Sequence, residues 1–312
     1  MKKFIKNCAL FSLGSLLVYV LALLAWGTWM PNIFKPNLIN DIETGGMTQL
    51  RLEEAKTIQQ KNILFLGSSH TYRSFDPRIF EAAGYSSFNL GTSSQSHLQT
   101  EILLQRYFKQ IQPKLVVYEV YPETFLYDGL ESGLDLIKED TIDFLALQMS
   151  LKINNIKAYN ALVYEYFMQI LGKERKTLSK IQGVDTYIQG GFVARQLQQA
   201  QLQNFQSEYI HFSAFQLNSF KRNIQFIKDQ GCEVLLVFAP IPPSKYKLLE
   251  GMPHFDTVMQ EQAHYIDFNT CISLNDTLDF YDANHLNQKG VTIFNPILID
   301  SIKRIFPQIK DQ

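Results

Sequence analysis

Most of the chain alternates short apolar runs with segments of helical periodicity. The apolar runs, rich in β-branched and aromatic residues, predict strands at 63–66, 87–90, 114–121, 233–239 and 265–268. The longer periodic segments predict helices at about 95–111, 213–231, 245–262 and 288–305. Strands that alternate with helices imply a parallel sheet covered on both faces, with right-handed crossovers. The pattern therefore predicts an α/β fold: a three-layer α/β/α sandwich with a flavodoxin-like parallel sheet of about five strands.

The amino terminus has a different pattern. Lys2, Lys3 and Lys6 precede an uncharged apolar run, Cys8–Met30. Its 23 residues would form a helix of about 34 Å, long enough to cross a bilayer core of roughly 30 Å. A cleaved signal peptide is the alternative, but its apolar region usually has only about 7–15 residues. We therefore expect an uncleaved, single-pass signal anchor.

The positions of the lysines predict the orientation of this anchor. The positive-inside rule keeps the amino terminus in the cytoplasm and places the chain after Pro31 outside it. The expected location is the inner or cytoplasmic membrane, with the carboxyl-terminal domain extracytoplasmic, or periplasmic in a Gram-negative cell.

Three segments are expected along the chain: a cytoplasmic tip and anchor (1–30), a tether and lead-in helix (31–60), and one α/β domain (61–312). Residues 123–212 interrupt the α/β rhythm and are expected to form a mostly helical insertion over the site. The insertion is compatible with a lid, a membrane-facing surface or a docking face for a partner. It is equally compatible with a structural elaboration that has no direct function.

Composition excludes several functional classes. The formal net charge is −1 and no basic stripe is present, which argues against a nucleic-acid partner. Cys8, Cys232 and Cys271 form no C-x-x-C pair, and no histidine–cysteine cluster has metal-ligand spacing. Cys232 and Cys271 are compatible with small buried side chains or with a bridge between them. Neither a metal nor a cofactor is expected.

Two motifs far apart in the sequence carry candidate chemistry. Gly67-Ser68-Ser69 follows the first predicted strand, and Asp282-Ala283-Asn284-His285 precedes the last helix. Alone, Gly-Ser-Ser is compatible with an ordinary turn. With the second motif it supplies a serine nucleophile, a histidine base whose ordinary pKa is about 6.5, and a carboxylate that orients the histidine.

These residues resemble the SGNH (GDSL-type) hydrolase superfamily over roughly 62–305, with the insertion unmatched. Gly67-Ser68-Ser69 is similar to its first block, Gly91 to its second and Asp282-x-x-His285 to its last. The resemblance implies that Ser69 is the nucleophile, His285 the base and Asp282 its orienting carboxylate. It also implies an oxyanion hole that uses the backbone N–H groups of Ser69 and Gly91.

The chain departs from this superfamily at two places. Ser68 replaces the usual aspartate, and the block after the third strand, 118–125, lacks the usual Gly-x-Asn-Asp, so the third oxyanion donor is unassigned. Together with the anchor, these features look more like a membrane-tethered branch. That branch includes the D-alanine transfer protein of teichoic-acid modification and SGNH-like proteins of alginate acetylation. Members of it work with a multi-span membrane-bound O-acyltransferase, which is the partner that the resemblance implies.

Two residues beside the candidate nucleophile are possible substrate contacts. His70 is expected at the rim of the site, as a loop residue or a contact to substrate. The forked guanidinium of Arg73 suits an anionic group of a substrate, and the alternative is an ion pair within the protein.

Three functions remain open at this stage. The first is a serine esterase or O-acyltransferase that acts on an acyl ester of a cell-envelope glycan or glycolipid. The second is a catalytically incomplete glycan-binding or scaffold subunit of an envelope-modification complex, motivated by the missing asparagine block. The third is a lipase that acts on membrane lipids.

Overall fold

The structure is a computed structural model that describes residues 1–38, 46–173, 178–201 and 203–309. It divides into two compact units. One is helical and combines Met1–Glu43 with Gly133–Lys176; the other is an α/β unit that combines Thr44–Ser132 with Thr177–Gln312. The helix α2 (Thr48–Ala55), predicted as a lead-in helix, belongs to the α/β unit, and residues 39–45 of the predicted tether lie outside the described residues.

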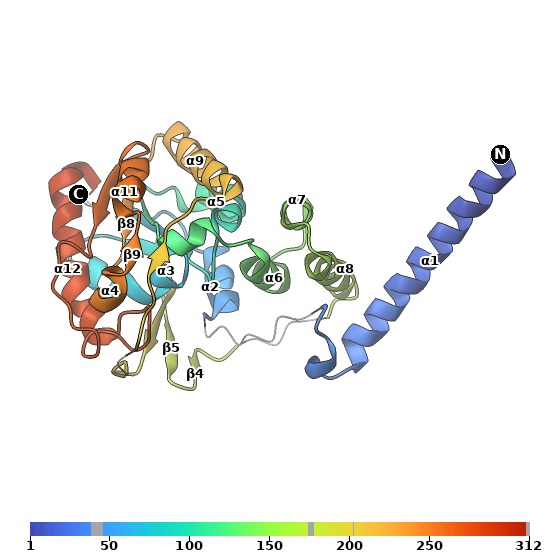
Figure 1. Ribbon diagram of the computed structural model, residues 1–312, viewed down its shortest axis with the longest axis horizontal. Coiled ribbons are helices and arrows are strands. Elements are labelled where there is room, and N and C mark those ends of the chain that lie inside the picture. The colour runs from blue at the N-terminus through green and yellow to red at the C-terminus, as the bar shows by residue number, and fades with distance from the viewer. Residues whose placement is uncertain (39–45, 174–177, 202, 310–312) are drawn as a thin grey trace. The chain divides into compact units, whose positions relative to one another are not determined.

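A five-stranded parallel sheet forms the centre of the α/β unit (Figure 1), which confirms the predicted fold class. Its strands lie in the order β10 (His264–Asp267), β8 (Glu233–Phe238), β3 (Leu115–Glu119), β1 (Ile63–Leu66) and β2 (Ser87–Asn89). This is the flavodoxin-like order, whose switch point lies between β1 and β3. Ligands of such sheets bind at the carboxyl ends of the strands on either side of that point.

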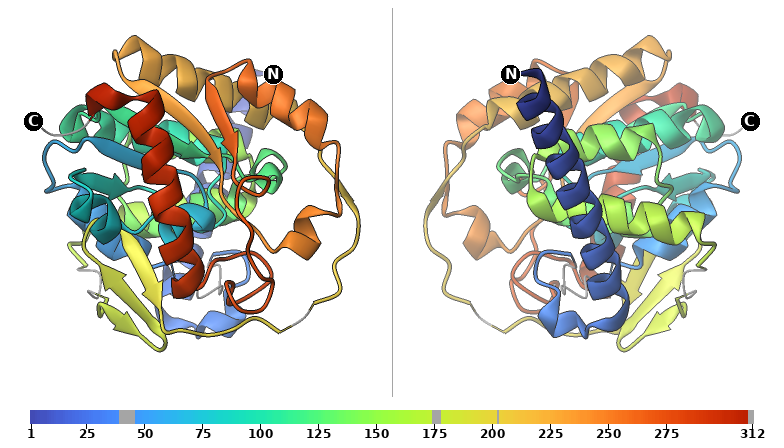
Figure 2. Two further views of the ribbon diagram at one scale, coloured as in Figure 1. Left: turned by 90° about the vertical axis from the view of Figure 1, so that its left-hand side faces the viewer. Right: turned by 90° about the vertical axis from the view of Figure 1, so that its right-hand side faces the viewer.

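Helices cover both faces of the sheet. On one face α5 (His97–Ile111) packs against α9 (Ala214–Asp229), and on the other α12 (Gln288–Ile305) packs against α4 (Pro77–Ala82). Figure 2 shows α12 running along its face of the sheet. The helix α4 begins because Asp76 accepts the backbone N–H of Arg78 and Pro77 occupies the first turn. The predicted bounds of the last helix are confirmed.

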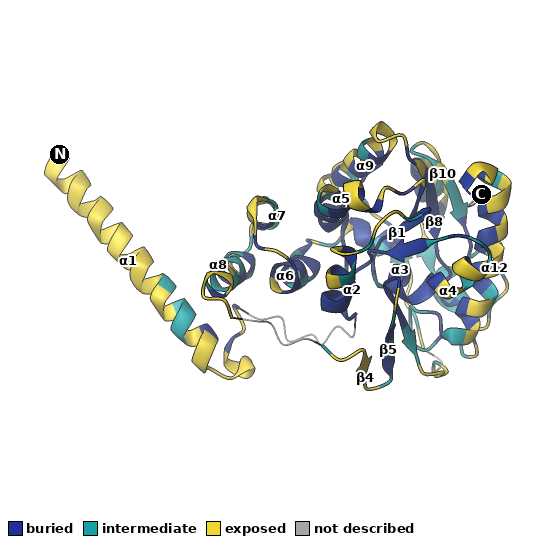
Figure 3. Ribbon diagram, turned by 180° about the vertical axis from the view of Figure 1, so that it is seen from behind, coloured by how far each residue is buried: buried dark blue, intermediate teal, exposed yellow. Residues whose placement is uncertain are grey.

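Aromatic packing fixes the first helix after β1. All four residues of β1 are buried (Figure 3). Phe65 of β1 stacks on Phe75 at 4.8 Å, and Phe75 in turn contacts Phe294 of α12. Phe75 directly follows α3 (Ser69–Ser74), so the core holds the carboxyl end of this short helix while its first residue lies at the strand end.

The segment predicted as a mostly helical insertion is helical only in its first part. Beyond it, β4 (Ile181–Gln182), β5 (Asp185–Ile188) and β6 (Phe192–Arg195) form an antiparallel sheet in the α/β unit, and β7 (Glu208–Tyr209) pairs with β9 (Leu249–Glu250). The single helix predicted over 245–262 is also wrong. It is divided into α10 (Pro243–Tyr246) and α11 (Met252–Gln260), because Gly251 adopts a left-handed φ of 89° between them.

The helical unit contains α1 (Lys2–Trp29), the short turn η1 (Asn32–Phe34), most of α6 (Leu130–Glu139), α7 (Phe144–Ile153) and α8 (Ile156–Ile170). By length and composition α1 is able to cross a membrane. It packs against α8, where the Tyr19 hydroxyl donates to Asn160 Oδ1 at 2.7 Å. Two further short turns in the chain are η2 (Pro122–Phe125) and η3 (Pro307–Ile309).

Candidate active site

Ser69 lies just past the carboxyl end of β1, as the first residue of α3. Gly67 makes the intervening turn with φ 138°, a conformation that favours glycine. A Cβ at this position would also lie 2.8 Å from Cβ of Glu119 on β3, so the close approach of the two strands excludes a larger residue. Ser69 remains partly exposed, whereas Ser68 is buried. The turn therefore presents the hydroxyl of Ser69, and encloses that of Ser68.

Asp282 and His285 occupy one tight loop before α12. The carboxylate Oδ1 of Asp282 accepts the backbone N–H groups of Asn284 and His285, both at 2.8 Å. These two bonds fold the loop so that His285 Nδ1 lies 2.8 Å from Asp282 Oδ2. Tyr281 stacks on the imidazole with an interplanar angle of 9°. Backbone and ring together hold the His285 side chain in one orientation.

The structure brings the two distant motifs together. His285 Nε2 lies 2.8 Å from Ser69 Oγ, although 216 positions separate the residues. Burial by itself would raise the pKa of Asp282, but its hydrogen bonds and its interaction with His285 lower that pKa to about 2. The ionised carboxylate favours the tautomer with a proton on Nδ1, which leaves Nε2 to accept the proton of Ser69. This chain of three groups is able to activate the serine hydroxyl.

The oxyanion role expected for Gly91 needs a correction. Its backbone N–H donates to Oδ1 of Asn89 at 3.0 Å, so this donor already has a partner inside the protein. A Cβ at position 91 would lie 2.7 Å from Thr71 Cβ and 2.8 Å from the carbonyl oxygen of Ser68. Close packing against the nucleophile turn therefore accounts for the glycine. The N–H of Ser69 stays a predicted oxyanion donor.

His70 lies inside the protein and not at the rim where it was expected. Its Nε2 donates to the carbonyl oxygen of Asn284 at 3.1 Å, and its ring lies 4.1 Å from that of Tyr121. Burial, followed by the charges of His285 and Lys245, lowers the pKa of His70 well below its ordinary value. The neutral imidazole therefore links α3 to the loop that carries the base.

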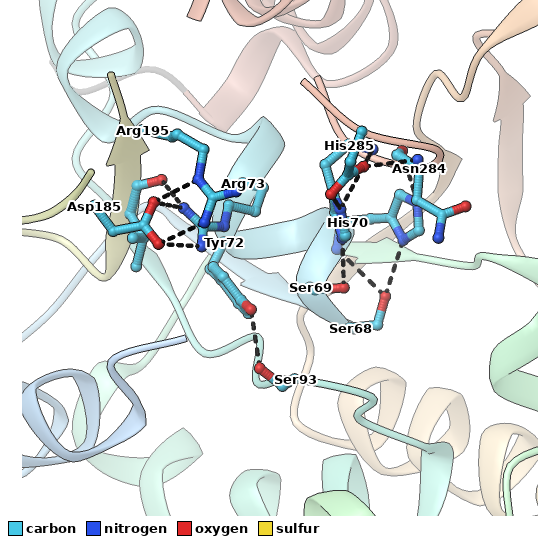
Figure 4. A network of polar contacts seen from close by, with 12 residues as sticks. Ser68, Ser69, His70, Tyr72, Arg73, Ser93, Asp185, Arg195, Asn284 and His285 are labelled. Carbon is cyan, nitrogen blue, oxygen red and sulfur yellow. Dashed lines mark hydrogen bonds and ion pairs between the residues drawn. The ribbon is translucent and has the colours of Figure 1, made fainter. Parts of the chain in front are cut away.

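Arg73 forms an internal ion pair, as its alternative interpretation stated (Figure 4). Its two terminal nitrogens donate to the two oxygens of Asp185 on β5, at 2.7 and 3.0 Å. Arg195 on β6 donates to the same carboxylate at 2.8 and 2.9 Å. The expectation that Arg73 binds substrate is therefore corrected: the guanidinium is directed at Asp185, and the pair braces α3 against the antiparallel sheet.

A lysine that sequence reasoning missed lies beside this loop. Lys245 Nζ donates to Tyr121 Oη and Asn284 Oδ1, both at 2.6 Å, and to Glu123 Oε1 at 2.9 Å. The Tyr121 hydroxyl also donates to Glu123. One ammonium group on α10 thus connects the segment that follows β3 to the loop that carries the base. No sequence motif surrounds Lys245. The only sequence feature near its contacts is the Tyr-Pro-Glu of 121–123, which contains two of its three partners.

A second buried carboxyl group lies beneath the nucleophile turn. Glu119 ends β3 and receives a hydrogen bond from the Ser68 hydroxyl at 3.3 Å. Burial raises the pKa of Glu119 to about 8, so the group is protonated at neutral pH. Within the described residues, no three His, Cys, Asp or Glu side chains gather as ligands for a metal ion.

Comparison with known proteins finds no matching family model and no matching curated protein. Three solved structures to which the chain is similar are a candidate acylhydrolase from Bacteroides fragilis (10% identity, TM-score 0.41), a GDSL-like lipase from Bacteroides thetaiotaomicron (11%, 0.40) and a candidate platelet activating factor protein from Streptococcus pneumonia (12%, 0.44). The alignments cover 85%, 84% and 83% of this chain and 99%, 99% and 92% of those chains, respectively.

Proposed function

We propose that this protein is a membrane-tethered, extracytoplasmic serine esterase or O-acyltransferase of the SGNH type. Its proposed substrate is an acyl ester of a cell-envelope glycan or glycolipid. The observation that carries the proposal is the pair of contacts made by His285, 2.8 Å to Ser69 Oγ on one side and 2.8 Å to Asp282 Oδ2 on the other. A partly exposed hydroxyl in this arrangement is an activated nucleophile.

The reaction proceeds in two halves. Ser69 Oγ attacks the carbonyl carbon of the ester while its proton moves to His285 Nε2, and Asp282 stabilises the resulting imidazolium. The tetrahedral intermediate collapses, the leaving alcohol takes the proton from His285, and the acyl group stays on Ser69. In the second half a water molecule or an acceptor hydroxyl gives its proton to His285 and attacks the acyl carbon, which regenerates the serine. Hydrolysis and transfer therefore differ only in the acceptor.

The membrane tether in this proposal is supported by the way α1 joins the folded helical unit. Besides the Tyr19–Asn160 hydrogen bond, Lys35 Nζ donates to the carbonyl oxygen of Gly27 at 2.6 Å. A cleaved signal peptide would take these contacts away, so they favour an uncleaved anchor. With the lysines of the amino terminus in the cytoplasm, the site faces the cell envelope. A multi-span membrane-bound O-acyltransferase is the proposed partner for acyl transfer.

A second candidate function is favoured by the oxyanion hole. The N–H of Gly91 is already bonded to Asn89, and loss of one oxyanion donor costs an enzyme about 2.7–4 kcal/mol of barrier. An incomplete site would leave a tethered glycan-binding or scaffold subunit of an envelope-modification complex. Strains that carry Ser69→Ala or His285→Ala would then keep the envelope phenotype that a deletion strain loses.

The experiment that tests the first function is reaction with a fluorophosphonate probe and with 4-nitrophenyl acetate. The full chain in detergent should label and turn over, and Ser69→Ala should lose both activities by about 10⁴-fold or more. Ser68→Ala is the matched control, because its hydroxyl lies one position away but is buried. Equal labelling of the wild type and Ser69→Ala would refute the proposal. Co-purification with an O-acyltransferase from membranes would favour transfer over hydrolysis.

A further inference from the structure

The helical unit carries large apolar side chains on its surface. Helices α7 and α8 form a hairpin joined by Asn154 and Asn155. On α7, Phe144 is 68% exposed and Leu151 57%. On α8, Ile170 is 60% exposed. A water-soluble surface usually leaves such side chains single and scattered, so their number on two short neighbouring helices indicates an apolar contact.

These side chains line one face of each helix. At about 100° per residue, the exposed residues of α7 fall within an arc of about 60° and those of α8 within about 80°. The exposed set is Phe144, Leu147 and Leu151 on α7 and Ile156, Tyr166 and Ile170 on α8. The opposite faces are packed inside the unit, through Ala146, Met149, Ala158 and Met168 among others. Each helix of the hairpin is therefore amphipathic, with its apolar face exposed and its opposite face buried.

The charges around this face suit a lipid headgroup layer. Lys152 is the penultimate residue of α7 and Lys157 is the second residue of α8, so both lie near the turn of the hairpin. The acidic side chain of Glu165 starts about half a turn around α8 from Ile156, which is outside the apolar arc of that helix. Lysines that flank an apolar face extend to lipid phosphates while their carbon chains stay in apolar surroundings. Since α7 is only about 15 Å long, it is too short to cross a bilayer and would lie along it.

The position of α8 on α1 sets the depth of the hairpin. Tyr19 of α1 donates to Asn160 of α8, and Gly27 of α1 faces Tyr164 so closely that a Cβ there would collide with its ring. Figure 2 shows the two helices crossing. If Trp26 marks the outer membrane interface, Gly27 lies at that level and Tyr19 about 10 Å further in, so the contacts of α8 with α1 span this range of depth. Interfacial amphipathic helices lie about 5–10 Å deep, so α8 is held at the corresponding depth.

We propose that the α7–α8 hairpin lies in the outer interface of the lipid bilayer, with its apolar face among the acyl chains. This inference rests on the membrane tether of the proposed function. A lipid surface is the occupant because a helix that crosses the membrane holds the hairpin at that depth. The protein would then contact the membrane through a span and an interfacial hairpin together.

The test measures the depth of single labels in the full chain. The protein is reconstituted into vesicles of phosphatidylethanolamine and phosphatidylglycerol, with its two exposed cysteines replaced by serine. An environment-sensitive fluorophore is placed at Leu151→Cys or Ile170→Cys. Ile297→Cys, an exposed aliphatic position on α12, is the matched control, and Leu13→Cys reports on the span. A nitroxide on the lipid acyl chain quenches the emission of labels that lie in the bilayer, and cobalt ions in the buffer quench labels that are exposed to water.

The inference expects that labels at 151 and 170 lose most of their emission to the nitroxide lipid and little to cobalt. The label at 297 should show the reverse. Cobalt quenching at 151 and 170 with lipid quenching at 13 would overturn the hairpin inference and leave the tether intact. Cobalt quenching at 13 would overturn the tether and the inference together. Protection of 151 and 170 from both quenchers would mean that a second copy covers the face, and would also overturn it.

Discussion

Replacement of Lys245 by methionine tests how the loop of Asp282 and His285 is held in place. The substitution removes the ammonium group that bonds to Tyr121, Glu123 and Asn284, and keeps most of the side-chain volume. A hydrogen bond to a charged group contributes about 1.5–3 kcal/mol. The expected loss is smaller than the sum of three such bonds, because Glu123 is partly exposed and regains hydrogen bonds to water once the ammonium group is gone. The expected loss of unfolding free energy is about 2–3 kcal/mol.

The effect on catalysis follows from the position of Asn284, which lies inside the Asp-x-x-His loop. Without Lys245 the side chain of Asn284 loses this hydrogen bond, so the loop that holds His285 against Asp282 and Tyr281 is able to shift as a unit relative to Ser69. A displacement of about 1 Å costs roughly 10²-fold in rate, so kcat with 4-nitrophenyl acetate should fall about 10- to 100-fold. KM should stay within about twofold, because Lys245 positions the base and does not touch the substrate.

Lys247→Met is the matched control, since Lys247 lies two positions away and is exposed. It should change neither the unfolding free energy nor kcat by more than the error of measurement. Urea denaturation and steady-state kinetics on the two variants give the comparison. If Lys245→Met kept the kcat of the wild type, the inference that this cation positions the base would be wrong.

Two further predictions concern the buried carboxyl groups of Glu119 and Asp185. Burial raises the pKa of Glu119 from 4.5 to about 8, so its contribution to the free energy of unfolding is fully present below pH 4.5 and is lost as the pH rises through about 8. Urea denaturation across this pH range should show that decline in the wild type and not in Glu119→Gln. An identical pH dependence of the two proteins would contradict the assignment. Asp185→Asn should lower the free energy of unfolding by about 3–5 kcal/mol, because Arg73 and Arg195 then face each other without a counter-charge. The control Asp300→Asn, at an exposed position, should change it by less than about 0.5 kcal/mol. Equal effects of the two substitutions would refute the pairing.

The sequence predicted those features that have a local physical cause. Apolar β-branched runs predicted the five strands, and the Asp76-Pro77 pair predicted the start of α4, because capping depends on adjacent residues. The meeting of Ser69 with His285 was implied by the resemblance that the two motifs carry, since His285 lies in the loop before α12 and not directly at a strand end. The strands and the helix start, in contrast, required only a pattern of neighbouring residues.

Contacts between distant polar side chains had no such signal. Arg73 and Asp185 are 112 positions apart, and Lys245 and Glu123 are 122 positions apart. A lysine or arginine with an internal partner has the same sequence surroundings as one that faces solvent. Gly91 shows a related difficulty: a glycine at a strand end is compatible with an oxyanion donor or with close packing. Only the hydrogen bond to Asn89 distinguishes the two.

The most direct test of the central claim is to locate the covalent adduct of a fluorophosphonate probe by mass spectrometry. Trypsin releases the peptide Asn62–Arg73, which contains both serines of the turn, and fragmentation of this peptide distinguishes them. The account predicts an adduct on Ser69 in the wild type and its loss in His285→Ala, because the hydroxyl then has no base. An adduct on Ser68, or undiminished modification of Ser69 without His285, would contradict it.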